Sequence, residues 1–573
     1  YKGGFPARYG GRLSSVIDIR MKEGNKKELR GSLGIGLIAS RLMLEGPINK
    51  KKDKGSWMIS GRRTYIDILA APLIKASLQG DGGAGYYFYD LNTKANYQLG
   101  KKDHIYLSAY TGQDRFYFNF SEAQSTKFKG SIDWGNFTGL LRWNHVFSSK
   151  VFGNLSATQS RYQFSVFNKI TSKDFNNKES SFSALYASKI RDWALKYDID
   201  YVPNTKHYIK TGISSTFHRF VPGALQVKNT DFPSDNIDTA FNIVNAPELD
   251  LYVEDDIELT AKWKANIGLH LSGFKTKQNW YASWQPRVST RYLITPMLSA
   301  KASFASMAQF IHLLTNNGIG LPTDLWVPVT DRIKPQQSHQ VAVGLAQSLA
   351  NDYEISVEGY YKWMKNIIDY KDGVSFLNTN QSWEDKVEMG KGWSYGGELF
   401  IQKKSGRLTG MMGYTLSWTN RQFPTINFGK RYPYKYDRRH DFKIAGVYHV
   451  SKKIELSADW VYGTGNAISM PLFRYNTASG YNPGSNFGGD IFYYGDRNNF
   501  RMRAYHRMDL GINFIKAKKN GGERIWNISV YNAYSRRNPY FIYSDYNYTQ
   551  QKYNFRQISL FPILPSFSYN LKF

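Results

Sequence analysis

The chain contains no cysteine, so its fold does not depend on disulfides. It also lacks any run of about 18 consecutive apolar residues, the length that a membrane-spanning helix requires. The mean hydropathy of −0.50 is too low for a protein that crosses a membrane with helices. These absences exclude a disulfide scaffold and a helical membrane protein, and they remain compatible with a closed β-barrel, which has no free edges to fasten.

Negative charge is scarce: 46 Asp and Glu stand against 75 Lys and Arg, which gives a net charge of +29. A nucleic-acid groove would interleave basic and aromatic residues on one surface, and the sequence holds no recognition motif of that kind. Many lysines instead fall in expected short turns, where they can meet anionic lipid headgroups. These are Lys50, Lys51, Lys52, Lys54, Lys101, Lys102, Lys452, Lys453, Lys516, Lys518 and Lys519. We therefore expect membrane lipids as partners and no nucleic acid.

Aromatic residues are abundant, at 16% of the chain, with 42 Tyr, 35 Phe and 14 Trp. Girdles of aromatic rings at the two membrane interfaces would use this excess, because such rings prefer the boundary between hydrocarbon and headgroups. A large secreted β-protein rich in tyrosine is the alternative, and few such proteins alternate their loop lengths regularly.

Between Leu29 and Phe573 the sequence divides into about 22 strand-like segments, and no break in composition separates domains. In Leu195–Tyr201, large apolar side chains alternate with Lys196, Asp198 and Asp200. This period of two suits a strand with one face towards lipid and the other towards a wet interior. The pattern predicts an all-β fold, a 22-stranded antiparallel transmembrane β-barrel.

The connectors between these segments alternate between short and long, as expected when one end of a barrel lies in a narrow compartment and the other at a cell surface. We expect every long connector on one side and every short connector on the other. Tyr65–Leu78 could form a short helix, although Pro72 interrupts it. The long connectors are expected near Thr64–Tyr86, His218–Pro247, Gln309–Gln336, Asn366–Lys391, Asn420–Tyr436, Thr464–Arg503 and Tyr534–Tyr553.

The residues before the first barrel strand have a different character. Gly3–Arg12 is rich in glycine, and Leu13–Met21 has the pattern of a strand. The alternative is an N-terminal loop followed by an extra edge strand. Tyr1 follows no methionine or signal peptide, so we expect the chain to be the remainder of a longer precursor.

Several pieces of the chain stand out by their order and spacing. The first is FPARYGGRLSSVIDIRMKEG at Phe5–Gly24. The later pieces are LPTDLWVP at Leu321–Pro328, IKPQQS at Ile333–Ser338, YDRRHDF at Tyr436–Phe442, YGDRNNFRMRAYHRMDLGINF at Tyr494–Phe514, WNISVYNAYSRRNPY at Trp526–Tyr540 and LFPILPSFSYNLKF at Leu560–Phe573. Together they resemble TonB-dependent outer-membrane receptors of the Bacteroidetes type, in which Phe5–Gly24 would be the end of the plug domain running into the first barrel strand. The resemblance covers essentially the whole chain.

The resemblance implies a barrel in the bacterial outer membrane, with lipid and lipopolysaccharide around it and an N-terminal plug inside it. Residues 1–25 would be the end of the plug and the lead-in, and residues 26–573 the barrel. The inner-membrane protein TonB would be a partner, and Phe573 would be the signal read by the barrel-assembly machinery. The sequence departs from the family pattern because it holds only the last piece of a plug and no TonB box.

No catalytic signature is present, and we expect neither an enzyme nor a cofactor. Among the ten histidines, His440 beside Asp441 is the most tempting metal ligand, but a polar cluster at the barrel rim explains it better. We expect no metal site. A glycine-rich phosphate loop and an activated nucleophile are likewise missing.

Aromatic and amide side chains on expected surface loops are the candidate ligand-binding residues. Aromatic faces can stack on sugars or planar chelates, and neighbouring amides and guanidinium groups can add hydrogen bonds. Packing of the loops and the upper girdle are the alternative roles. The candidates are Tyr87, Tyr89, Trp326, Trp383, Tyr493, Arg497 and Asn498.

Two functions remain open from the sequence. The first is a receptor barrel that imports a scarce nutrient, such as a siderophore, cobalamin, a peptide or an oligosaccharide. The second is a structural or adaptor barrel in a larger outer-membrane complex, held by a surface lipoprotein or other subunits. A TonB box upstream of Tyr1 would favour the first.

Overall fold

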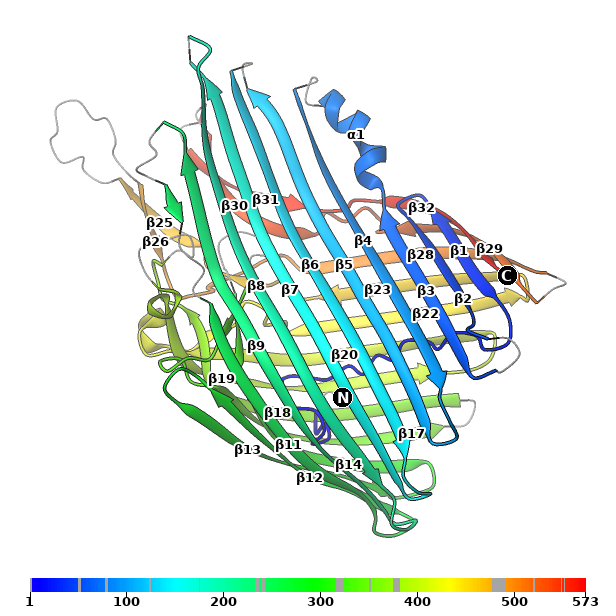
Figure 1. Ribbon diagram of the computed structural model, residues 1–573. Helices are drawn as coiled ribbons and strands as arrows, with labels where there is room; N and C mark the ends of the chain where they lie inside the picture. The colour runs from blue at the N-terminus through cyan, green and yellow to red at the C-terminus, as the bar shows by residue number, and fades with distance from the viewer. Residues whose placement is uncertain are drawn as a thin grey trace.

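The strands of the chain close into a single barrel in the computed structural model (Figure 1). The structure describes residues 3–49, 53–77, 81–122, 125–174, 176–231, 236–238, 243–315, 324–349, 352–374, 382–476, 490–518, 521–547, 549–550 and 552–573. Sequential strands pair antiparallel, and the last strand pairs with the first, with Leu33 opposite Leu571. Closure leaves no unpaired edge in the wall, which allows a sheet to span a membrane.

Within the described residues the wall has 22 strands, as predicted, and the two-residue strands β10 (Ile237–Asp238) and β21 (Tyr432–Pro433) bring the sheet to 24. The wall strands are β1 (Arg30–Gly36), β2 (Ala39–Pro47), β3 (Gly55–Thr64), β4 (Gly82–Gln98), β5 (Asp103–Glu122), β6 (Thr126–Val146), β7 (Val151–Lys173), β8 (Glu179–Tyr201), β9 (His207–Asn229), β11 (Val244–Glu258) and β12 (Trp263–Lys275). They continue with β13 (Trp280–Leu293), β14 (Leu298–Gln309), β17 (Gln336–Leu349), β18 (Tyr353–Tyr370), β19 (Val387–Lys403), β20 (Leu408–Gln422), β22 (His440–Ser451), β23 (Ile454–Gly463), β28 (Tyr505–Ala517), β29 (Glu523–Tyr531) and β32 (Leu564–Lys572).

The two faces of the wall carry different side chains, as the alternation predicted. On β8, Leu195 points outward and is 55% exposed, whereas Asp198 points inward and accepts a hydrogen bond of 2.6 Å from the Tyr252 hydroxyl. Trp284 and Val343 are likewise outward and more than half exposed. Exposed apolar side chains suit a surface in contact with lipid, and charged side chains suit the interior.

Every long connector lies at one end of the barrel: residues 65–81, 230–243, 310–335, 371–386, 423–439, 464–504 and 532–563. The other end has only short connectors: residues 48–54, 99–102, 147–150, 202–206, 259–262, 294–297, 350–352, 404–407, 452–453 and 518–522. The prediction that all short connectors share one end is wrong, because residues 37–38, 123–125, 174–178 and 276–279 lie at the long-connector end. The expected connector His218–Pro247 is also too long, since β9 and β11 extend into it.

Several long connectors contain structure of their own. Helix α1 (Ile66–Ser77) confirms the expected helix, with Pro72 inside it. Two 3₁₀ helices are η3 (Trp383–Lys386) and η4 (Ile426–Gly429). Four small pairs are β15 (Ile311–Leu314) with β16 (Leu325–Pro328), β24 (Ala467–Ile468) with β27 (Phe500–Arg501), β25 (Pro471–Asn476) with β26 (Asp490–Tyr494), and β30 (Pro539–Asn547) with β31 (Lys552–Ser559). None of the described helices combines the length and apolar character needed to cross a membrane.

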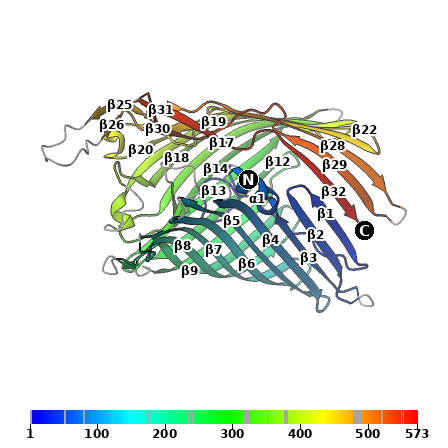
Figure 2. The ribbon, with the colours of Figure 1, turned by 90° about the horizontal axis from the view of Figure 1, so that it is seen from above.

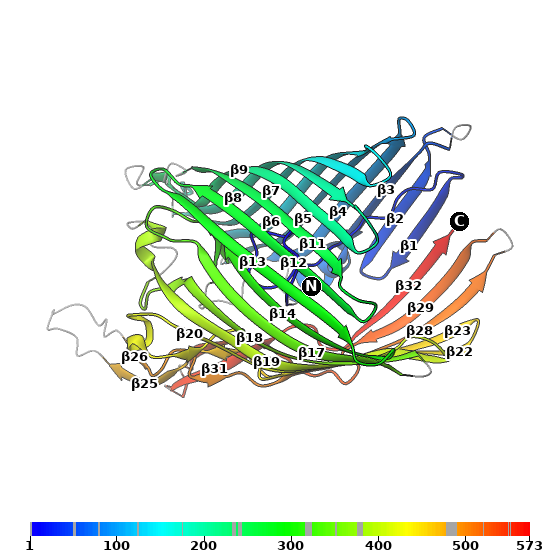
Figure 3. The ribbon, with the colours of Figure 1, turned by 90° about the horizontal axis from the view of Figure 1, so that it is seen from below.

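The N-terminal segment lies inside the ring of strands, as the views from the two ends show (Figures 2 and 3). Phe5 and Leu13 are buried in a cluster with Ala305 and Met307 of β14. The expected strand at Leu13–Met21 is wrong as a strand assignment, because no ladder partner stands beside this stretch in the described structure. The segment runs inside the lumen, and it positions the first candidate site.

Candidate functional site

The N-terminal segment is fixed to one side of the inner wall by buried charged groups. The Arg8 guanidinium forms an ion pair with Glu254 of β11, whose side chain is fully buried, and the Arg8 backbone N–H donates to the same carboxylate at 3.0 Å. Burial alone would lower the pKa of Arg8, but the adjacent Glu254 carboxylate raises it overall. A buried carboxylate is stable only with such a partner, so this pair holds the segment in place.

Side chains of the wall also bind backbone carbonyl groups of the segment. Arg287 of β13, which is 2% exposed, donates to the carbonyl oxygens of Pro6, at 2.7 Å, and Tyr9. His270 Nδ1 lies 2.8 Å from the Ala7 oxygen, and Lys362 donates to the Leu13 oxygen. We call these contacts, together with the Arg8–Glu254 pair, the anchor.

The other end of the segment is attached to the opposite wall. Lys22 forms a 2.5 Å ion pair with Glu45 of β2, and Lys94 of β4 forms a 2.5 Å ion pair with Glu23. Between the two attachments, Ile17 and Ile19 are 81% and 82% exposed. The segment therefore crosses the lumen and is held at both ends. Its extended middle exposes apolar side chains that the described residues do not cover.

A second network of charges joins the loops at the long-connector end. The Arg497 guanidinium donates to Asp369, at 3.1 Å, and to Asp372, at 2.6 Å. Tyr432 donates its hydroxyl to Asp369 at 3.0 Å, and burial together with Asp369 raises the pKa of this phenol. Burial lowers the pKa of Arg497, but Asp369, Tyr432 and Asp372 together outweigh burial, and the net shift is upward. Arg497 therefore ties residues 490–501 to the end of β18.

The predicted binding residue Asn498 is also engaged within the protein. Its side-chain amide donates to the Pro433 oxygen at 2.8 Å, its backbone N–H donates to Ser469 Oγ at 3.0 Å, and the residue is 6% exposed. Its φ of 54° is left-handed, a conformation that asparagine tolerates well. The positions of Arg497 and Asn498 fit the alternative role of packing the loops, and their binding role stays a prediction.

Tyr87 and Tyr89 do not lie in a loop, which corrects the expectation, because β4 begins at Gly82. They share the outward face of β4 with Leu91, whereas Lys94 points into the lumen. Tyr89 is 40% exposed and donates its hydroxyl to Gln113 at 3.0 Å. In the sequence, aromatic residues on the outward face of a long strand are hard to distinguish from aromatic residues in a loop. The outward position of Tyr87 and Tyr89 suits the upper girdle.

The other aromatic candidates lie in the loops as expected. Trp326 in β16 and Trp383 in η3 are partly buried against two apolar clusters, so both pack the loops. Tyr493 in β26 is 50% exposed, and its ring stacks on Phe473 with centroids 6.0 Å apart. Of the three, Tyr493 has the ring most available to a ligand or partner.

The described residues contain no group of three or more His, Asp or Glu side chains arranged to hold a metal ion. His440 accepts or donates a 2.9 Å hydrogen bond with the Tyr414 hydroxyl and is exposed. The sequence reading missed the anchor residues Glu254, Arg287 and Lys362. Each of these residues is a charged residue at an inward position of a strand. The alternation of apolar and polar residues identifies such positions, but it does not show what the side chain binds.

Comparison with known proteins agrees with this architecture. A family model described as "TonB dependent receptor-like, beta-barrel" matches residues 70–533. A search of curated proteins returned no match. The structure resembles the ferripyoverdine receptor of the outer membrane of Pseudomonas aeruginosa bound to ferripyoverdine, with a TM-score of 0.66 and 12% identity over 100% of this chain and 75% of that one.

Two further solved structures share the fold. The ferric-catecholate import receptor of E. coli K12 gives a TM-score of 0.62 and 13% identity over 100% of this chain and 85% of that one. The siderophore receptor of Acinetobacter baumannii gives 0.61 and 12% over 100% and 84%. The family match covers most of the chain, and the structure is a closed antiparallel barrel of 22 strands. The chain therefore belongs to the TonB-dependent receptors and is an outer-membrane β-barrel of that family.

Proposed function

We propose that this barrel belongs to an energy-coupled importer, which admits a scarce nutrient through its lumen. The observation that carries the proposal is the anchored N-terminal segment, because a chain fixed across the lumen is what a gated pathway needs. A ferric siderophore is the first candidate, since the structural neighbours include a receptor bound to ferripyoverdine. Cobalamin, a peptide and an oligosaccharide are the other candidates.

We assign residues 1–25 to the end of a plug domain and residues 26–573 to the barrel. The extended stretch with exposed Ile17 and Ile19 supports this assignment, because an unpaired extended backbone with apolar side chains is a site where another strand adds. In this proposal the rest of a plug of the Bacteroidetes type covers Ile17 and Ile19. The amides of residues 14–20 would then be protected from hydrogen exchange in the full-length protein.

TonB is the partner that would supply the work, by pulling on the plug from the periplasm. The chain would then bind and conduct its nutrient and would perform no covalent chemistry, with no resident cofactor. The outward apolar face would contact outer-membrane lipids and lipopolysaccharide. Of the predicted ligand residues, Tyr493 is the one we retain as a direct contact. Trp326, Trp383, Arg497 and Asn498 would shape the mouth, and Tyr87 and Tyr89 would belong to the upper girdle.

Phe573 is proposed as the assembly signal. Its backbone exchanges two hydrogen bonds with Gly31, of 2.8 and 3.0 Å, and its ring is 51% exposed beside the seam between β1 and β32. A terminal aromatic at the closing seam supports such a role. Replacing Phe573 with Asp should reduce membrane insertion and leave synthesis unchanged, as measured by heat-modifiable migration in gels.

The alternative function, an adaptor barrel in a larger complex, is favoured by one specific surface. In the hairpin β25–β26, Phe473 stands opposite Tyr493 and Tyr475 opposite Ile491, and all four side chains are at least half exposed. The other face of the hairpin packs on β31 through Phe492 and Tyr553, 5.5 Å between ring centroids. A surface lipoprotein or another subunit would dock on the exposed face.

The test is nutrient uptake by cells that carry the full-length protein as their only receptor of this kind. Ferric siderophores, cobalamin, peptides and oligosaccharides are supplied in turn, with and without a protonophore. Import predicts that one class accumulates in energised cells and that the protonophore abolishes accumulation while surface binding persists. If no nutrient class accumulates and the protein instead carries binding partners in fixed proportion, the importer proposal is wrong and the adaptor function is favoured.

A further inference from the structure

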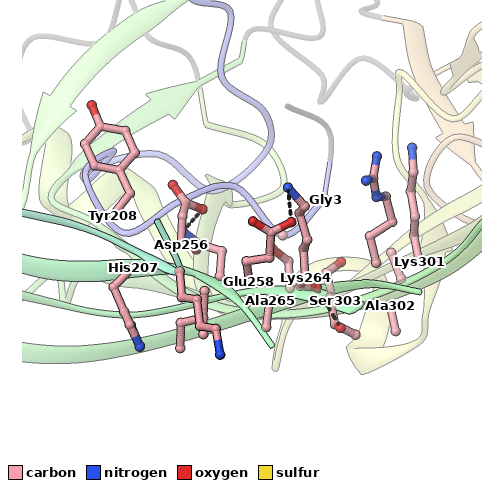
Figure 4. A pocket seen from close by; sticks show the side chains of 18 of the residues that line it. Gly3, His207, Tyr208, Asp256, Glu258, Lys264, Ala265, Lys301, Ala302 and Ser303 are labelled. Carbon is pink, nitrogen blue, oxygen red and sulfur yellow. Dashed lines mark hydrogen bonds and ion pairs between the residues drawn. The ribbon is translucent and has the colours of Figure 1, made fainter. Parts of the chain in front are cut away.

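A pocket of about 670 Å³ lies on the inner wall towards the short-connector end, where Figure 4 shows charged side chains from neighbouring strands. Strands β9, β11, β12, β13, β14, β17 and β18 line it, and Gly3 and Gly4 of the N-terminal segment form part of its rim. Neither the import proposal nor the family assigns a role to this pocket.

Three cations stand side by side across the floor of the pocket. Lys264 of β12 is directly opposite Arg291 of β13, and Arg291 is directly opposite Lys301 of β14. All three line the pocket. Opposed residues have Cβ atoms about 5 Å apart, and like charges in such pairs destabilise a sheet. We call Lys264, Arg291 and Lys301 the cationic row.

The protein neutralises only one end of this row. Lys264 Nζ lies 3.0 Å from a carboxylate oxygen of Glu258. Arg291 and Lys301 are exposed to the lumen and form no ion pair within the part of the chain that the structure describes. Elsewhere on the inner wall, by contrast, Lys196 has Asp198 at 3.0 Å. Arg291 and Lys301 are thus two neighbouring cations for which the described residues supply no ion-pair partner.

Hydrogen-bonding groups border the row on the side of the N-terminal segment. Asn266, Ser289 and Ser303 are consecutive cross-strand neighbours one inward position further along, and all line the pocket. Gly4, with φ of +56°, approaches so closely that an added Cβ would lie 2.2 Å from Ser303 Cβ. Charged donors on one side and neutral donors on the other are the environment that an oxyanion needs.

We propose that the cationic row is a binding site for an oxyanion, a carboxylate or phosphate group held between Arg291 and Lys301. The planar guanidinium of Arg291 offers paired N–H donors to such a group, and Lys301 adds a second charge. Opposed cations repel one another, and an oxyanion held between Arg291 and Lys301 would offset that repulsion. The oxyanion belongs either to a soluble anion or to an acidic side chain of the protein itself.

The test uses the full-length protein in detergent, with pyrophosphate as the probe and sodium chloride at matched ionic strength as the reference. The measurements are the thermal midpoint of barrel unfolding and the dissociation constant for pyrophosphate by calorimetry. The variants are Arg291→Gln and Lys301→Gln, and the control is Lys101→Gln, an exposed lysine in the connector 99–102 outside the pocket.

A soluble anion predicts that pyrophosphate raises the midpoint of the wild type and of Lys101→Gln. Either pocket variant should bind pyrophosphate at least about tenfold more weakly, the loss expected for one hydrogen bond to a charged group. In chloride alone, Arg291→Gln should raise the midpoint, because it relieves the repulsion within the row.

If the oxyanion is an internal carboxylate, the pocket variants should change the thermal midpoint in chloride in the opposite direction. The wild type would ignore pyrophosphate, and Arg291→Gln and Lys301→Gln would each lower the midpoint, because each strips a buried carboxylate of its partner. Either pattern supports an oxyanion site and identifies its source. If both pocket variants behave like Lys101→Gln in chloride and in pyrophosphate, the row is only a solvated surface and the proposal is wrong.

Discussion

Two arginines on the same face of β13 have opposite surroundings. Arg287 is 2% exposed and binds two carbonyl oxygens of the N-terminal segment, whereas Arg291, two inward positions further along the strand, is exposed and has no ion-pair partner among the described residues. The neighbouring acids differ in the same way, since Glu254 is fully buried against Arg8 and the Glu258 side chain is 39% exposed. One inner wall thus carries both the anchor and the cationic row.

The difference shows how burial decides what a charge can do. A charge removed from water must have its partner inside the protein, so the anchor is complete and specific. A charge that stays in water is stable without a partner, so the cationic row remains available to bind one. The anchor is suited to holding a segment in place, and the row is suited to exchanging a ligand.

The largest effect should come from Glu254→Gln, which leaves the Arg8 guanidinium without its carboxylate. We expect the opening of residues 5–13 to become easier by about 3–5 kcal/mol, as when one partner of a buried ion pair is removed. Hydrogen exchange of those amides, measured by mass spectrometry, reports this opening. Glu258→Gln is the matched control on the same strand, and equal effects of the two variants would erase the distinction between anchor and row.

Arg497→Ala extends the comparison to the other end of the barrel, where the side chain of Arg497 is 11% exposed between Asp369 and Asp372. Loss of its charged hydrogen bonds should loosen the loops by about 2–3 kcal/mol. Faster hydrogen exchange in residues 423–439 and 490–501 is the expected result. Arg503→Ala, at an exposed position, should leave these amides unchanged.

A pH dependence follows from His312, which lies in the connector 310–335. Complete burial lowers the pKa of His312 to about 3, and the neutral ring fits its partners, the Lys334 oxygen at 3.1 Å and the Gln336 amide at 2.8 Å. Because the opened state binds a proton below a pH of about 6.5, the β15–β16 pair should lose stability as the pH falls from there towards 3.

At pH 5 the loss should be about 2 kcal/mol. It is measured by hydrogen exchange of Ile311–Leu314 at pH 7 and pH 5. In His312→Gln this pH dependence should disappear. A wild-type hairpin with the same protection at both pH values would mean that His312 is protonated in the folded protein.

The smallest effect concerns salt. Added sodium chloride screens the repulsion among exposed Lys264, Arg291 and Lys301, and should stabilise the barrel by less than about 1 kcal/mol. The gain should be absent in Arg291→Gln, whereas buried contacts of the anchor should not respond to salt in either protein. A salt effect of equal size in Arg291→Gln would place its origin elsewhere.

The sequence predicted the barrel well because its wall repeats a simple rule. A period of two with apolar residues outward and polar residues inward recurs along the wall, and seven long connectors fall at one end as expected. The rule does not determine where a strand begins. Tyr87 and Tyr89 then read as loop residues, although β4 already includes them.

The candidate sites were harder to predict, because they depend on pairs distant in the sequence. Nothing near Arg8 indicates Glu254, and nothing near Arg291 indicates Lys264 and Lys301 as its neighbours. Strand register creates both arrangements. The same holds for Arg497 and Asn498, whose side chains are recognisable as hydrogen-bonding groups but whose partners lie in other loops.

The central claim is that residues 5–13 are fixed to the inner wall, and the absence of cysteine allows a direct test with a single engineered thiol. Leu13→Cys, at a position that is 7% exposed, is compared with Lys101→Cys in an exposed connector of the full-length protein. The anchor predicts that a maleimide labels Leu13→Cys at least about 100-fold more slowly, which corresponds to an opening free energy near 3 kcal/mol. Labelling of the two thiols at similar rates would show that the segment moves freely in the lumen and would contradict the account.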